Sequence, residues 1–200
     1  MVMIAQPNFS VLTPQDYLDW EQQQPLRYEY LNGQVLAMTG GTLAHNDIAV
    51  NLTTALRTFL RGSGCKVRMA DAKVQLSESG PYFYPDVVVS CDERDRMAKN
   101  FIRFPVVIIE VLSPSTTTFD RGDKFKFYQQ LSSLQEYILI DSEKMAVDVF
   151  ERSSGNRWEL RRYPEIPLGV NAQESITLNS LAFSCSLASI YDEVYGISSE

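Results

Sequence analysis

Hydrophobic positions along this 200-residue chain repeat with two different periods, and the changes of period mark the expected helices and strands. Between residues 43 and 60, apolar side chains recur every three or four positions, which predicts a long helix with one buried face. Residues 106–112 instead form a nearly continuous apolar run, typical of a central strand that is covered on both faces. Further helices are expected near residues 14–21, 119–134 and 186–195.

Other strands are predicted where β-prone runs are bounded by turn residues. The clearest turn is Asn32-Gly33, because this pair supplies the positive φ angles of a tight hairpin between two such runs. The remaining strands are expected near residues 66–76, 82–91, 137–140, 146–151 and 157–163. The order of these elements predicts one mixed α/β domain with a central mixed sheet flanked by helices.

We expect this single domain, residues 1–200, to have three parts. A helix and a hairpin form an N-terminal extension at residues 1–42, the sheet core follows at 43–145, and a hairpin and helix complete the chain at 146–200. The sequence contains no internal repeat and no low-complexity linker that would argue for separate domains.

The net charge of the chain limits the kinds of molecule that it is expected to bind. Eighteen Lys and Arg residues oppose twenty-five Asp and Glu residues, so the formal net charge is −7. This balance disfavours loose electrostatic binding to DNA or to an anionic membrane surface, and it makes any nucleic-acid binding depend on local features. No run of about 18 apolar residues predicts a membrane span, so we expect a soluble, cytoplasmic protein.

The cysteines point to the same compartment. Cys65, Cys91 and Cys185 are an odd number, lie far apart in sequence and form no CxxC pair, and the chain has one histidine. This pattern argues against a zinc site or a disulfide framework and favours a reducing cytosol.

Two acids interrupt the most hydrophobic strands. Glu110 lies within the apolar run 106–112, and Asp86 directly precedes Val87-Val88-Val89. A buried, unpaired carboxylate costs several kcal/mol, so such a group is neutralised, paired with a cation or bound to a metal. Taken singly, Asp86 is read as a turn or capping residue and Glu110 as the partner of a surface arginine. Together they predict a site for a hard cation such as Mg²⁺.

A cation for this site follows on the next helix. Asp120, Lys124 and Tyr128 are spaced by four and therefore share one helix face, apart from the apolar stripe. An ordinary ion pair on a solvated face is the alternative interpretation. The short connection at residues 113–117 favours function, because it leads directly from Glu110 to this helix and could return Lys124 to the carboxylates.

These motifs also carry a family resemblance that spans almost the whole chain. Segments at residues 28–33, 85–86, 107–116, 120–128 and 136–141, together with His45, closely resemble the Uma family of bacterial restriction-endonuclease-like proteins. The resemblance implies the PD-(D/E)xK nuclease fold and a magnesium-dependent phosphodiesterase core. It further implies that Asp86 and Glu110 hold the metal and that Glu29 lies nearby as a further acid.

The chain departs from the standard motif at one position. The motif lysine follows the second acid by two residues, and that place is occupied here by Leu112. The resemblance suggests that Lys124 supplies the ammonium instead, with Lys73 as the competing candidate. Tyr128 is expected to bond to Lys124 or to a phosphate. His45 is a general acid, a substrate contact or a helix-start hydrogen-bonding residue, and the last role is favoured.

The predicted function is hydrolysis of phosphodiester bonds in DNA with Mg²⁺ or Mn²⁺. A catalytically inactive module for nucleic-acid or protein interaction is the main alternative, favoured by Leu112 and by the net charge of −7. A hydrolase of sugars or small phosphates is a third alternative, with less support.

We expect a homodimer, because a double-strand cut by one active site usually calls for two-fold symmetry. The basic residues available to line a cleft are Arg57, Arg61, Lys66, Arg68, Arg94, Arg96, Lys99, Arg103, Arg121, Lys124 and Lys126.

Overall fold

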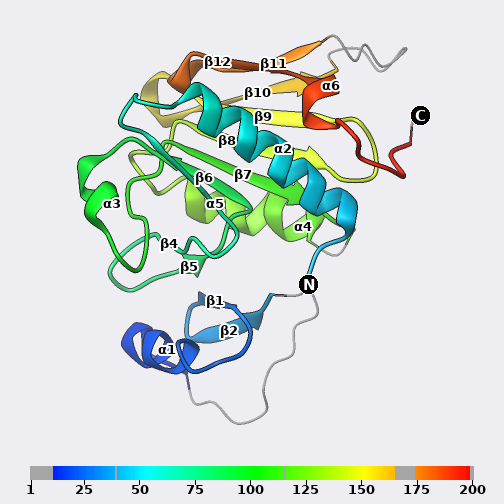
Figure 1. Ribbon diagram of the computed structural model, residues 1–200. Coiled ribbons are helices and arrows are strands. Elements are labelled where there is room, and N and C mark those ends of the chain that lie inside the picture. Colours follow the sequence, from blue (N-terminus) through cyan, green and yellow to red (C-terminus); the bar gives the residue numbers. More distant parts are fainter. Residues whose placement is uncertain (1–10, 39, 115, 165–173, 199–200) are drawn as a thin grey trace.

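The computed structural model describes residues 11–38, 40–114, 116–164 and 174–198, and a six-stranded sheet lies at its centre (Figure 1). The strand order is β10-β9-β8-β7-β6-β3. Strands β7 and β8 are parallel and the other neighbours are antiparallel, so the sheet is mixed, as predicted. Its strands are β3 (Lys66–Met69), β6 (Val87–Ser90), β7 (Val107–Leu112), β8 (Glu136–Asp141), β9 (Val147–Arg152) and β10 (Trp158–Tyr163).

A smaller sheet with the order β2-β1-β5-β4 lies toward the N-terminal end of the chain (Figure 1). The predicted hairpin is confirmed, with Asn32 at φ 49° and Gly33 at φ 86° in its turn. A capping box between Thr13 and Asp16 starts the preceding helix. The elements of this region are α1 (Pro14–Glu21), β1 (Tyr28–Leu31), β2 (Gln34–Ala37), β4 (Val74–Gln75) and β5 (Tyr82–Phe83).

Different elements cover the two faces of the central sheet. One face packs against α2 (Leu43–Phe59), α6 (Leu187–Ile190) and a hairpin of β11 (Ser175–Leu178) and β12 (Phe183–Ser186). The other packs against α4 (Thr117–Phe119), the π-helical η1 (Asp120–Lys124) and α5 (Phe125–Tyr128). The remaining short helices are α3 (Glu93–Met97), η2 (Ser154–Asn156) and η3 (Asn179–Leu181).

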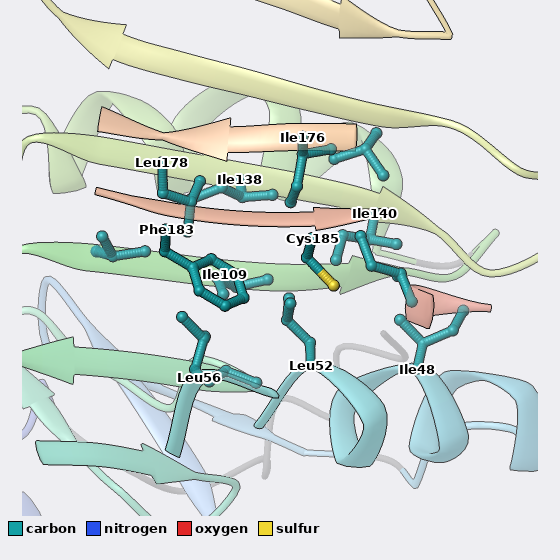
Figure 2. Close-up of a cluster of buried hydrophobic side chains, with 14 of the residues drawn as sticks. Ile48, Leu52, Leu56, Ile109, Ile138, Ile140, Ile176, Leu178, Phe183 and Cys185 are labelled. Carbon is teal, nitrogen blue, oxygen red and sulfur yellow. The ribbon is translucent and has the colours of Figure 1, made fainter. Parts of the chain in front are cut away.

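The predicted long helix is confirmed, and its apolar stripe builds the larger core. Ile48, Leu52 and Leu56 of α2 meet Ile109 of β7 and Ile138 of β8 (Figure 2). These five side chains are fully buried. Burying a large aliphatic side chain contributes roughly 1.5–3 kcal/mol, so this contact fixes α2 firmly on the sheet.

Strand alternation decides which way Glu110 faces. In β7, Ile109 belongs to the core under α2, whereas Ile108 and Leu112 belong to the core that contains Tyr128. Because side chains alternate along a strand, Glu110 faces the same side as Ile108 and Leu112, toward η1 and α5.

Two predicted strands are each divided between the sheets. The segment 66–76 leaves the central sheet after β3 and joins the smaller sheet as β4, and 82–91 joins the smaller sheet first as β5. Ala70 adopts a left-handed φ of 53°, which ends β3. Pro85 has no N–H to give to a ladder, so it separates β5 from β6.

Several other predicted boundaries were wrong. The helix expected at 119–134 begins at Thr117 and ends at Tyr128, after which the chain turns. The C-terminal helix is four residues long because it ends at Ile190, after which the chain turns. The strands β11 and β12 that precede it were not predicted. The helix α3 lies in a part of the chain for which no element was predicted.

The expectation that the cysteines are unpaired was also wrong. Cys65 and Cys91 form a disulfide, and Cys185 is free and buried. The antiparallel register pairs Lys66 with Ser90, which brings the next residues, Cys65 and Cys91, opposite each other despite a sequence separation of 26. Within the described residues no helix is both long and apolar enough to cross a membrane.

Candidate active site

The pairing of β6 with β7 brings Asp86 and Glu110 together. Val87 lies opposite Ile109 in this antiparallel ladder, so the residue before β6 lies close to the end of β7. The amide of Val111 donates to Asp86 Oδ2 at 2.7 Å. Asp86 and Glu110 line the same pocket, which has a volume of about 370 Å³.

Lys124 of η1 is surrounded by carboxylates. Its Nζ lies 2.9 Å from Glu110 Oε1, 3.1 Å from Glu29 Oε1 and 3.6 Å from Asp120 Oδ1. All four side chains are at most 6% exposed. Carboxylates from three elements, β1, β7 and η1, thus hold one ammonium group at the base of the pocket.

Two tyrosines support the glutamates. The Tyr128 hydroxyl donates to Glu110 Oε1 at 3.1 Å, and the Tyr84 amide donates to Glu29 Oε1 at 3.0 Å. Tyr128 therefore contacts a carboxylate, and not Lys124 as one of the predicted alternatives had it. These bonds limit the movement of both carboxylates, since each is held by a donor from a neighbouring element.

Negative charge exceeds positive charge inside the site. Burial raises the pKa of Glu110 well above its ordinary range, and Asp120, Asp86 and Glu29 add to this effect against the opposing effect of Lys124. Burial lowers the pKa of Lys124, but the surrounding carboxylates outweigh it and raise that pKa well above its usual value. Lys124 is therefore a fixed positive charge.

His45 has a role that the sequence did not indicate. Its backbone amide is capped by Thr42 Oγ1 at 3.2 Å, as expected at a helix start. Its imidazole bonds outside the helix, since Nε2 lies 2.8 Å from Asp86 Oδ1. Burial lowers the pKa of His45, but the bond and charge of Asp86 outweigh this effect and raise it.

Lys73, the competing candidate, lies elsewhere. Its Nζ bonds to Glu21 Oε2 at 3.1 Å and sits 4.7 Å from the centre of the Tyr17 ring. Tyr84 donates to the other oxygen of Glu21 at 2.8 Å. Lys73 thus belongs to a separate buried cluster that joins α1 to the start of β4, and Lys124 is the lysine beside Glu110.

Asp120 is the site residue whose importance the sequence understated. The spacing of four already placed it on the face of Lys124, but no role was assigned to it. It is 4% exposed, and its carbonyl accepts a bond from the Tyr137 hydroxyl at 3.0 Å. This third buried acid beside Lys124 was therefore detectable from sequence as part of the same helical pattern.

The donor set suits a hard cation. Asp86 and Glu110 offer carboxylate oxygens to one pocket, and the four acids Glu29, Asp86, Glu110 and Asp120 outnumber the single lysine. No group of three His, Cys, Asp or Glu side chains is arranged to hold an ion within the described part of the chain. Mg²⁺ commonly binds one or two carboxylates and completes its shell with water and substrate phosphate, so this pair fits it.

Comparison with known proteins gives the relationship of the chain. An uncharacterized protein of Synechocystis sp., slr1290, is 37% identical over 92% of this chain and 93% of its own length. A second, sll1609, is 31% identical over 86% of this chain and 96% of its own. A crystal structure of a putative nuclease from Anabaena variabilis matches with a TM-score of 0.72 at 15% identity, covering 90% of this chain and 97% of that one.

The structural match shows the fold, a nuclease-like arrangement of a central mixed sheet and helices. The family model described as Uma2, putative restriction endonuclease, matches residues 14–188, which include every residue of the site above. The chain belongs to the Uma2 family.

Proposed function

We propose that this protein is a metal-dependent nuclease that hydrolyses phosphodiester bonds in DNA. The observation that carries the proposal is the convergence of Asp86, Glu110 and Lys124 on one pocket. Paired carboxylates can hold a divalent cation. Together with the buried ammonium, such a cation suits an anionic substrate and a reaction that builds further negative charge. Membership of a family of putative restriction endonucleases supports the same conclusion.

Asp86 and Glu110 would hold Mg²⁺ or Mn²⁺, and such an ion lowers the pKa of bound water and screens charge on the phosphate. Lys124 provides a positive charge whose position is set by Glu29 and Asp120, so little reorganisation is needed when a phosphate oxygen becomes more negative.

Neighbouring residues keep the metal-binding oxygens in place. Tyr128 holds Glu110 Oε1, and His45 and the Val111 amide hold the two oxygens of Asp86. Residues that bond to a metal ligand in this way fix its orientation, and full affinity for the metal depends on them. They act as positioning residues, because none of them needs to touch the reacting atoms.

The direct test is cleavage of supercoiled plasmid and of single-stranded DNA in Mg²⁺, in Mn²⁺ and in chelator. We expect wild type to cut only with metal, and Asp86→Asn, Glu110→Gln and Lys124→Ala to lose at least about 100-fold in rate. Lys126→Ala is the matched control, since this exposed lysine lies two residues from Lys124 and pairs with Asp123. Equal cutting by wild type and Asp86→Asn would refute the assignment.

Metal binding is measured separately from cleavage. Mg²⁺ should raise the thermal unfolding midpoint of wild type, because a ligand that binds the native state stabilises it. The rise should disappear in Asp86→Asn and Glu110→Gln and persist in Lys126→Ala.

The homodimer expected from the need to cut both strands is tested by sedimentation of the wild type with and without DNA.

A catalytically inactive binding module is the second candidate. It is favoured by the fact that Asp86 Oδ1, Asp86 Oδ2 and Glu110 Oε1 already have partners within the protein. DNA binding without cleavage, together with an unchanged unfolding midpoint in Mg²⁺ and Mn²⁺, would establish this alternative.

A further inference from the structure

Two more hollows adjoin the pocket that is lined by Asp86 and Glu110, which we call the active pocket. The first, about 300 Å³, shares Met69 and Asp71 with the active pocket and is lined also by Arg68 and Lys99. The second, about 510 Å³, shares Lys99 with the first and adds Arg94 and Arg103. Of the five basic residues that line these two hollows, Lys73 is buried and paired with Glu21. We call the other four the basic track; they are Arg68, Arg94, Lys99 and Arg103.

The basic track begins beside the candidate catalytic carboxylates. The Ala70 amide donates to the Asp86 carbonyl at 3.1 Å, and Arg68 lies two residues earlier on β3. From Asp86, β6 leads to α3, which lies at one side of the central sheet and carries Arg94 (Figure 1). Residues 98–104 then bring Lys99 and Arg103 to the same surface.

Two of the four basic groups are held in position by aromatic rings. The Arg94 guanidinium carbon lies 3.4 Å from the centre of the Phe104 ring, and that of Arg103 lies 4.9 Å from the centre of Phe101. A stacked guanidinium loses less freedom on binding an anion. Some of the donors are in use, because Nε and Nη2 of Arg94 donate to Asp92 and Nε of Arg103 donates to Gln75, so an anion would bind to the remaining N–H groups.

The acids along the basic track are already satisfied. Asp95 is 2% exposed and accepts bonds from the Ser90 hydroxyl at 2.6 Å and from the amides of Arg103 and Phe104, each at 2.9 Å. Asp71, on the rim shared with the active pocket, pairs with Arg27 at 3.1 Å. Neither of these two acids forms an ion pair with a basic residue of the track, whereas Asp92 pairs with Arg94 at 2.7 Å.

Two of the basic groups retain binding capacity. Lys99 is exposed and makes no ion pair with any described residue. Arg68 donates from Nη2 to the Asp95 carbonyl at 3.1 Å, but its buried Nη1 has no hydrogen-bond partner within the described residues. A buried donor left unpaired is costly, and a small shift of the Arg68 side chain toward the hollow would let a phosphate oxygen accept its hydrogen bond.

We propose that the basic track binds backbone phosphates of the nucleic-acid strand whose neighbouring bond enters the active pocket. This inference rests on the proposed function, because the track matters for catalysis only if the pocket receives a phosphodiester. Arginine and lysine with free donors are the usual partners of backbone phosphates. The track also explains how a chain with a net charge of −7 can hold DNA through a local basic surface.

The test measures binding of a fluorescently labelled DNA oligonucleotide, single-stranded and duplex, in chelator so that no cleavage occurs. Lys99→Gln and Arg68→Gln are each expected to weaken binding about 3- to 10-fold at low salt. Each should also lower the slope of log affinity against log salt by about 0.7–0.9, the value for one lost phosphate contact. Arg157→Gln is the matched control, since Arg157 is exposed at the opposite edge of the sheet, next to β10.

Lys99 is exposed, so Lys99→Gln keeps the proposal testable if Arg68→Gln lowers the unfolding midpoint. Wild-type affinity and slope in Lys99→Gln, or an equal loss in Arg157→Gln, would overturn the proposal. So would equal competition by polyglutamate, which would assign the surface to acidic polymers in general. Binding through the track without metal-dependent cleavage would refute only the proposed function, whereas cleavage unaffected by both track variants would refute only the track.

Discussion

Two glutamates in neighbouring parallel strands, Glu110 of β7 and Glu136 of β8, are both almost inaccessible to solvent, yet they have opposite surroundings. Glu136 accepts bonds from the amides of Asn179 and Ser180, at 2.8 and 3.2 Å, and a short one from the Ser180 hydroxyl. The Nη2 atom of Arg161 lies 3.7 Å from Glu136 Oε1. Glu110 shares Lys124 with two other carboxylates.

The difference separates a structural acid from a candidate catalytic one. Fixed backbone donors satisfy Glu136 and thereby fasten the connection between β11 and β12 to the central sheet. Glu110 lies among like charges that favour a cation and faces a pocket. Burial of an acid in an apolar strand is therefore insufficient to identify a site, and the donors around it decide.

The largest expected effect is on activity. Glu110→Gln should reduce DNA cleavage at least about 100-fold while leaving the fold intact, because Lys124 keeps Glu29 and Asp120 as counter-charges. Cleavage per folded molecule should be unchanged in Glu136→Gln. The comparison fails if both variants lose the same fraction of activity, with folding checked by circular dichroism.

The next effect is on stability. Glu136→Gln places an amide N–H₂ group against the amides of Asn179 and Ser180, so the free energy of unfolding should fall by about 1–3 kcal/mol. Urea denaturation measures this change. An undiminished midpoint would mean that the acid does not fasten the hairpin.

A smaller loss is expected when only a supporting bond is removed. Tyr128→Phe deletes the hydroxyl that donates to Glu110, and one such bond is worth about 1 kcal/mol, or roughly a fivefold lower rate. The reduction should appear in kcat with KM unchanged, since Tyr128 is fully buried and offers no surface to a substrate. Steady-state cleavage kinetics distinguish this result from a change in KM.

The smallest effect is the dependence of stability on pH. Burial raises the pKa of Glu136 above its ordinary value of 4.5, and the bonds from Ser180 and Asn179 only partly offset the rise. The native state therefore holds this proton more tightly than the unfolded state, so its contribution to stability falls as pH rises from about 4.5 through the raised native value. Urea titrations should show this slope in wild type and a shallower one in Glu136→Gln; parallel slopes would exclude it.

Much of the architecture was predictable because it depends on local patterns. The spacing of apolar residues in α2, the apolar run of β7 and the Asn32-Gly33 turn each act within a few residues. Asp120, Lys124 and Tyr128 likewise share a helix face through their spacing of four. The acids Asp86 and Glu110 were identifiable because carboxylates are costly in apolar strands.

The sequence by itself thus determined the main elements, the unusual position of Asp86 and Glu110, and the helical face that carries Lys124. Tertiary structure alone decided that His45 contacts Asp86, that Glu29 reaches Lys124, that Lys73 pairs with Glu21, and that Cys65 meets Cys91. Each of these contacts joins residues at least 26 positions apart. They depend on how strands and helices pair across the fold, which local propensity and periodicity do not encode.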